Sequence, residues 1–318
     1  MPVPAQSLPN ALSQGTVVLD GGLSNQLSDQ GQDLSGELWS ARLLAEEPDQ
    51  IVAAHAAYLR AGARVLITSS YQASFDGFAR YGAGPDAAAG LLADSVRLAR
   101  RASDAEGVPA WVAASVGPYG ATLADGSEYR GRYGLSARSL ERFHRPRLEV
   151  LAAAEPDVLA METIPDIDEA EVLLAVASGL GVPVWLSYTI DGTVTRAGQP
   201  LADAFAVARD NDQVLAVGVN CCDPRDVHAA VEIASQATGK PIVVYPNSGE
   251  RWDAARRGWQ GDSAFDPELV QGWRASGASL IGGCCRVGPT EIAALATHLA
   301  AGLGAPSAGG SLTSPAAS

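Results

Sequence analysis

The stretch PDQIVAAHAAYLRAGARVLIT, residues 48–68, contains a helix, a short turn and a strand in immediate succession. Pro48 suits the first turn of a helix, apolar residues recur every three or four positions, and Gly62 suits the helix end. The run RVLIT that follows is nearly all apolar. Such a strand is typical of a parallel sheet that is covered on both faces.

The same pairing of apolar strand and helix recurs eight times along the chain. Strands are expected at 16–20, 64–68, 110–117, 157–163, 182–189, 214–221, 241–247 and 279–285. Helices are expected at 48–62, 86–105, 139–154, 166–178, 201–209, 224–237, 267–275 and 290–301. This alternation predicts an α/β protein with a (β/α)8 barrel of the TIM type. A doubly wound sheet is the alternative, but no G-x-G-x-x-G follows the first strand.

The connections differ between the two ends of the predicted barrel. Helix-to-strand turns are short, whereas the strand-to-helix segments 21–36, 69–85, 117–137 and 247–266 are long. Barrel enzymes carry their active sites on the strand-to-helix loops, so the site is expected there. We assign 1–14 to an N-terminal segment, 15–302 to the barrel, and 303–318 to a disordered tail rich in small residues, Pro and Gly.

Composition excludes several classes of partner. The 318 residues carry a net charge of −14, which argues against nucleic-acid binding because phosphate contacts need clustered Lys and Arg. No uninterrupted apolar run is long enough to span a membrane, and the N-terminus lacks the features of a signal peptide. Four cysteines form no disulfide framework, so a cytoplasmic location with reduced thiols is expected.

All four cysteines fall at the carboxyl ends of two predicted strands. Cys221 and Cys222 end the sixth strand, and Cys284 and Cys285 end the eighth. Only one strand separates these two in the barrel, so the thiols can meet across its mouth. Zinc suits such ligands, and three thiolates with one open position would form a catalytic site. Side chains alternate along a strand, so Cys284 and Cys285 can both face one ion only if the chain turns there. We expect Gly282 and Gly283 to make such a turn easier.

Other interpretations of the cysteines remain open. A single cysteine in an apolar run is usually a small buried hydrophobic residue. A redox pair is possible, although there is no C-x-x-C. A structural zinc site with four thiolates is a further alternative.

Polar residues also stand at the other strand ends. Asp20 precedes Gly21 and Gly22, Ser70 follows the second strand, and Glu162 ends the fourth. Asp20 could form a turn and Ser70 could cap one. Glu162 is harder to explain structurally, because an unpaired carboxylate at the end of a buried strand is costly. The four histidines, His55, His144, His228 and His298, lie in predicted helices, and we expect surface or hydrogen-bonded roles for them.

The chain resembles the homocysteine S-methyltransferases, a family of zinc-dependent (β/α)8 barrels. The resemblance covers about 15–302 and is carried by several segments. These are LDGGLSNQLSDQGQDLSGELWSARLL, ITSSYQASFDGF, METIPDIDEA, VGVNCC, VVYPNSGE and IGGCCRVGP. The pair GVNC and GGCCR is the most specific of them, and the resemblance implies that Cys221, Cys284 and Cys285 bind zinc. Cys222 lies one position beyond the family's ligand, so the resemblance implies no zinc-binding role for it.

The resemblance implies roles for the remaining strand ends as well. Asp20 and Glu162 would hold the ammonium group of L-homocysteine. Backbone amides near Gly21 and Gly22, together with Ser70, would hold its carboxylate, and Asn220 would shape the site beside the zinc.

The resemblance also narrows the range of candidate methyl donors. The chain ends one helix after the eighth strand, which leaves no room for cobalamin or folate modules or for the oligomerisation arm of the betaine-using members. ETIPD and YPNSGE look most like the branch that uses S-methylmethionine, with S-adenosylmethionine the next candidate. A selenocysteine or other thiol methyltransferase, and a structural-zinc barrel that binds amino acids, are the alternatives. Oligomeric state cannot be inferred from the sequence.

Overall fold

A computed structural model describes residues 4–34, 40–253 and 258–301 of the chain. Its main sheet has eight parallel strands in the order β1-β12-β9-β8-β5-β4-β3-β2. The strands are β1 (Val17–Val18), β2 (Val65–Ile67), β3 (Trp111–Val116), β4 (Val158–Ile164), β5 (Val184–Tyr188), β8 (Val214–Asn220), β9 (Ile242–Tyr245) and β12 (Ala278–Ile281). Each lies within a strand predicted from the sequence or overlaps it.

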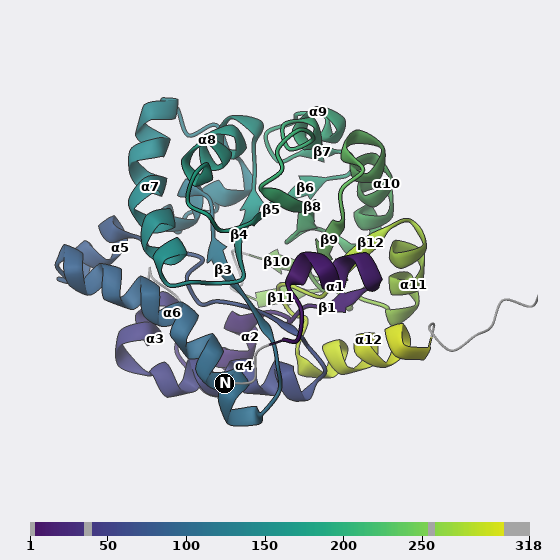
Figure 1. Ribbon diagram of the computed structural model, residues 1–318, viewed down its shortest axis with the longest axis horizontal. Coiled ribbons are helices and arrows are strands. Elements are labelled where there is room, and N and C mark those ends of the chain that lie inside the picture. The colour runs from purple at the N-terminus through teal and green to yellow at the C-terminus, as the bar shows by residue number, and fades with distance from the viewer. Residues whose placement is uncertain (1–3, 35–39, 254–257, 302–318) are drawn as a thin grey trace, which may run out of the picture.

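The sheet closes between its first and last strands. A parallel bridge joins Leu19 to Val65, the Arg64 amide donates to the Val18 carbonyl (2.9 Å), and the Asp20 amide donates to the Val65 carbonyl (3.1 Å). These bonds complete the ring, so the predicted (β/α)8 barrel is confirmed. Figure 1 shows the helices arranged around the strands.

Eight helices alternate with the barrel strands on the outside. They are α4 (Pro48–Arg60), α6 (Pro85–Glu106), α7 (Ala137–Ala153), α8 (Ile167–Ala177), α9 (Leu201–Ala206), α10 (Val227–Thr238), α11 (Pro267–Ala275) and α12 (Pro289–Ala301). The strands are apolar on both faces because one face packs against these helices and the other fills the barrel. Gly218 in β8 shows how tightly neighbouring strands pack, since a Cβ there would lie 1.7 Å from the Val243 carbonyl oxygen.

The N-terminal segment contains a helix that the sequence analysis did not predict. Helix α1 (Leu8–Gln14) buries Leu8, Ala11 and Leu12 in the same cluster as the residues inside the barrel. The Trp111 indole donates to the Gln6 carbonyl oxygen (3.1 Å) just before this helix. Figure 1 shows α1 lying in front of the barrel strands. The segment therefore packs against the barrel interior at the end where the strands begin.

The long strand-to-helix segments contain short elements of their own. These are α2 (Leu23–Asp29), α3 (Ser40–Glu46), α5 (Phe75–Arg80), the 3-10 turns η1 (Tyr119–Leu123), η2 (Ser127–Tyr129) and η3 (Pro224–Asp226), and the hairpins β6 (Ile190–Asp191) with β7 (Val194–Thr195) and β10 (Arg251–Asp253) with β11 (Gly258–Gln260). The predicted tail at 303–318 lies outside the described residues. None of the helices within the described ranges is long and apolar enough to cross a membrane.

Three of the four histidines are exposed, half-buried or hydrogen-bonded, as expected, and His55 is the exception. His144 is paired, while His228 is exposed and His298 half-buried. His55 in α4 is fully buried, and neither ring nitrogen has a hydrogen-bond partner within the described part of the chain. Burial lowers the pKa of His55 from 6.5 to about 4, because the imidazolium cannot be solvated there.

We expect His55 to make the fold sensitive to acid. As pH falls below 6.5, the unfolded chain binds a proton at this site that the folded chain does not bind until about pH 4. Stability contributed by the neutral ring is therefore present above pH 6.5 and is lost as pH falls, by about 2 kcal/mol between pH 7.5 and 5. Urea unfolding at both pH values should show a smaller decrease for His55→Leu than for the wild type. Equal decreases in both proteins would contradict the assignment.

Candidate active site

A cavity of about 120 Å³ lies at the end of the barrel where the strands finish. Its walls combine glycines after β1, polar residues after β2, polar residues in the last part of β4, residues of η2, and the cysteines after β8 and β12. The main polar and aromatic lining residues are Ser69, Tyr71, Glu128, Tyr129, Glu162, Thr163, Cys221, Tyr245, Cys284 and Cys285. A cavity therefore lies at the end of the barrel where the sequence predicts the site.

Three of the four cysteines converge on this cavity. The sulfur atoms of Cys221, Cys284 and Cys285 all lie within 4.8 Å of one another, and the Sγ atoms of Cys221 and Cys285 are 3.8 Å apart. Cys222 instead packs in the hydrophobic cluster between barrel and helices. The chain direction changes between Cys221 and Cys222, so one thiol points to the cavity and the other to the hydrophobic cluster.

Strand β9, which lies between β8 and β12, holds both cysteine segments in place. The Cys221 amide donates to the Tyr245 carbonyl oxygen (3.2 Å), and the Cys284 amide donates to the Pro246 carbonyl oxygen (2.7 Å). Because these acceptors are consecutive residues, the two segments are fixed side by side. The sulfur cluster thus depends on the order of strands in the barrel.

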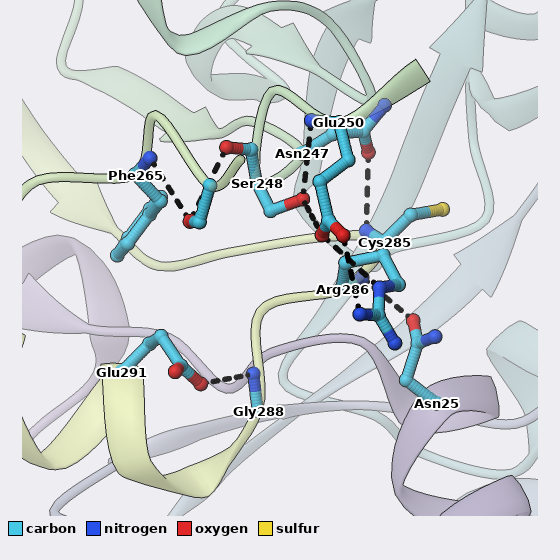
Figure 2. Close-up of polar contacts among 10 residues, drawn as sticks. Asn25, Asn247, Ser248, Glu250, Phe265, Cys285, Arg286, Gly288 and Glu291 are labelled. Atoms are coloured by element: carbon cyan, nitrogen blue, oxygen red, sulfur yellow. Dashed lines mark hydrogen bonds and ion pairs between the residues drawn. The ribbon is translucent and has the colours of Figure 1, made fainter. Parts of the chain in front are cut away.

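Side chains from two other loops fix the residues that follow. The Cys285 amide donates to Asn247 Oδ1 (3.1 Å), and the Arg286 amide donates to Asn25 Oδ1 (2.7 Å). The Arg286 guanidinium pairs with both carboxylate oxygens of Glu250 (3.1 and 3.2 Å). Figure 2 shows these contacts converging on the chain at Cys285 and Arg286. The loop that carries two thiols is therefore braced from both sides.

The paired glycines act differently from what we expected. Neither Gly282 nor Gly283 has a positive φ, whereas Cys221 (φ 50°) and Arg286 (φ 67°) do. The glycines are needed for space instead, since a Cβ on Gly282 would lie 2.5 Å from the Leu19 Cβ. The chain turns at Cys221 and Arg286, while Gly282 allows the chain after β12 to approach β1 closely and Gly283 leaves room for the Val287 side chain.

The thiols influence one another electrostatically. Hydrogen bonds from the Cys284 and Cys285 thiols lower the pKa of Cys221 well below its usual range, although burial opposes this shift. The same contacts with Cys221 raise the pKa of Cys284 and of Cys285. The three thiols therefore share their protons closely, and a cation in the cluster would favour the thiolate form of all three.

Two carboxylates are buried beside the cluster. Asp20 is 1% exposed, and its Oδ2 accepts a hydrogen bond from the Ile67 amide (2.8 Å) while Oδ1 has no partner among the described residues. Burial raises the pKa of Asp20. Burial also raises the pKa of Glu162 to about 7, although hydrogen bonds from Ser115 and Tyr245 oppose the increase. Glu162 lines the cavity and is suited to binding a cation that would replace the lost hydration, whereas Asp20 does not line it and lies behind the wall at the Ile67 amide.

The structure corrects part of the expected carboxylate site. The Ser70 hydroxyl donates to the Ser115 carbonyl (2.7 Å) and does not line the cavity, and the Gly22 amide donates to the Val287 carbonyl (2.9 Å). Ser69 lines the cavity instead, and its hydroxyl has no partner in the described ranges. The chain leaves β2 at this point, so strict alternation no longer decides which serine faces inward.

Asn220 acts behind the wall of the cavity. Its Oδ1 accepts from the Thr163 amide (2.7 Å), and its Nδ2 donates to the Thr163 hydroxyl (2.7 Å). Thr163 has a φ of 58°, which is rare for a β-branched residue. Asn220 therefore holds the end of β4 in a strained turn next to Glu162.

Sequence reasoning missed Glu128 and Tyr129 in η2, which both line the cavity. The Tyr129 hydroxyl lies 3.0 Å from the Cys221 sulfur. The segment 117–137 was expected only as a long loop. An acidic and an aromatic residue side by side in a loop give no signal of burial, and only the tertiary fold places them at the thiols.

Comparison with known proteins identifies the family. A family model described as homocysteine S-methyltransferase matches residues 17–299. Homocysteine S-methyltransferase 4 of Zea mays is 46% identical and covers 89% of each chain. Homocysteine S-methyltransferase of Escherichia coli K12 is 42% identical, covering 89% of this chain and 94% of the other.

A solved structure agrees with these matches. The metallated form of the homocysteine methyltransferase MmuM from Escherichia coli superposes with a TM-score of 0.81 at 40% identity, covering 89% of this chain and 96% of the other. The similarity extends over the barrel and its cysteine-bearing loops alike. The chain is a methyltransferase that belongs to the homocysteine S-methyltransferase family.

Proposed function

We propose that the chain transfers a methyl group from a sulfonium donor to the thiol of L-homocysteine, giving methionine in the cytoplasm. The observation that carries this proposal is the cluster of three thiols at the wall of a cavity. A structural metal site is usually closed by four protein ligands, whereas three ligands facing a cavity leave a position for a substrate.

The three thiols fit a zinc ion. Zinc–sulfur bonds of about 2.3 Å in a tetrahedron place sulfur atoms about 3.8 Å apart. The Cys221 and Cys285 sulfurs already lie 3.8 Å apart. Zinc bound there would lower the pKa of the homocysteine thiol, which is otherwise mostly protonated near neutral pH.

The residues around the cluster would orient homocysteine. Glu162, which lines the cavity, and Asp20, which lies behind its wall with Oδ1 unpartnered among the described residues, would supply negative charge for its ammonium group. For the carboxylate we propose the Gly21 amide with the Ser69 hydroxyl in place of Ser70, since the Ser69 hydroxyl lacks another partner within the described chain. Holding both ends of the amino acid would aim its sulfur at the donor.

The methyl transfer is a displacement at carbon. The acceptor sulfur, having lost its proton to solvent, forms a bond to the methyl carbon while the bond from that carbon to the donor sulfur breaks. The bonding electron pair stays on the donor sulfur, which leaves as a neutral thioether. Negative and positive charge cancel in this step, so a cavity with little water favours it.

The charge of the cavity supports a sulfonium donor. Among the described residues, its lining includes Glu128 and Glu162 but no Lys, Arg or His. Such a cavity favours a cation over an anionic donor. We favour S-methylmethionine, on the segments ETIPD and YPNSGE, with S-adenosylmethionine as the next candidate.

Substitutions at the cysteines should separate catalytic from structural zinc. Cys284→Ala removes a thiolate from the cluster, so we expect zinc content to fall well below about one ion per chain and methionine formation to cease. Cys222→Ala is the matched control, because this thiol packs in the core. It should retain zinc and turnover. Equal loss of zinc in Cys222→Ala and Cys221→Ala would instead indicate a four-thiolate structural site.

A panel of donors tests the reaction itself. The zinc-loaded protein should form methionine from homocysteine with S-methylmethionine, and more slowly with S-adenosylmethionine. Mass spectrometry of the products would detect each reaction, with L-selenocysteine included as an alternative acceptor. A zinc-loaded protein that makes no methionine from any sulfonium donor would refute the proposal.

A further inference from the structure

One carboxylate in the cavity has no role in the acceptor site described above. Glu128 in η2 is 5% exposed and lines the cavity, and its Oε2 has no partner among the described residues. Burial raises the pKa of Glu128, and a backbone hydrogen bond and the charge of Arg130 offset that increase only in part. A buried, unpaired acceptor is costly unless a ligand satisfies it.

Two arginines lie near the segment that carries Glu128, and neither forms an ion pair with Glu128 among the described residues. Arg130, two positions along the chain, is 61% exposed at its side chain, lies 3.5 Å from an Asp125 carboxylate oxygen, and donates to the Ser127 hydroxyl (2.8 Å). The Arg196 guanidinium lies 5.9 Å from the centre of the Tyr129 ring, does not line the cavity, and has a buried Nε without a partner among the described residues. Within the described residues Glu128 therefore has no direct ion pair, and the charge of Arg130 acts on it only at a distance.

The segment that carries Glu128 is fixed against the thiol cluster. The hydroxyl of the next residue, Tyr129, lies 3.0 Å from the Cys221 sulfur. Behind the segment, a Cβ on Gly120 would lie 2.6 Å from the Glu128 amide nitrogen, so η1 and η2 are in close contact. A group bound by Glu128 would consequently lie near the thiol cluster, where the proposed function places the acceptor sulfur.

We propose that the Glu128 carboxylate binds the positive charge of the sulfonium donor and so selects cationic donors. This inference rests on the proposed function and adds the donor subsite to it. Asp20 and Glu162 serve the acceptor in that function, which leaves Glu128 as the carboxylate for the second substrate. The donor loses its charge on transfer, so the neutral thioether is no longer attracted and can leave.

The disappearance of charge predicts a particular kinetic effect. Glu128 interacts with the full charge of the bound donor but with a smaller charge in the transition state. It should therefore lower KM for the donor without raising kcat. In Glu128→Gln we expect KM for S-methylmethionine to rise about 10- to 100-fold, with kcat unchanged or increased and KM for homocysteine unchanged.

Binding to the zinc-loaded protein tests the same idea without turnover. Calorimetry would compare S-methylmethionine with 2-amino-5-methylhexanoate, in which CH replaces the sulfonium sulfur and the charge is absent. The wild type should bind the sulfonium compound more tightly. Glu128→Gln should lose this preference and bind the neutral compound as before, and Glu128→Asp should keep part of it. Glu162→Gln is the matched control and should weaken homocysteine binding instead.

The outcomes separate the two proposals. Equal weakening of both compounds in Glu128→Gln, or an effect confined to homocysteine, would overturn the role of Glu128 and leave the proposed function intact. So would a wild type that binds the two compounds equally, a result that does not depend on how the variant folds. A wild type that methylates no thiol refutes the proposed function itself. Zinc content and melting temperature of each variant confirm that the fold is preserved.

Discussion

The residues at the end of β9 determine the geometry of the site. The carbonyls of Tyr245 and Pro246 accept hydrogen bonds from Cys221 and Cys284, so one short segment positions cysteines that are 63 residues apart in the chain. This arrangement requires β9 to lie between β8 and β12, which the closed barrel enforces. A different strand order would leave the same cysteines too far apart to bind one ion.

The barrel and the meeting of its cysteines could be predicted from the sequence, because the barrel repeats a single strand-helix unit. Continuous apolar runs located all eight strands, and strand order then brought the cysteines together. Helix α1 was missed because seven residues with Pro9 near the start give little periodic signal. The resemblance pointed to Ser70, whereas Ser69 is the serine that lines the cavity, because the regular alternation of side chains ends where β2 ends.

The residues of η2 show a different limit. Glu128 and Tyr129 reach the cavity through the packing of one loop on another, and local sequence carries no information about that contact. The resemblance to a family supplied the acceptor site, whereas the donor side depends on an unpaired oxygen that only the folded structure reveals. The acceptor side of the cavity is therefore assigned from the family resemblance, and the donor side from the folded structure.

The left-handed backbone at Cys221, Thr163 and Arg286 has a consequence for folding energetics. Each such residue costs about 1 kcal/mol relative to an ordinary conformation, so strain is concentrated at the mouth of the barrel. A metal ion that binds only the folded arrangement offsets this cost by mass action. The melting temperature should accordingly report how fully the protein is loaded with metal, and the mouth should be the first region to open when the ion is removed.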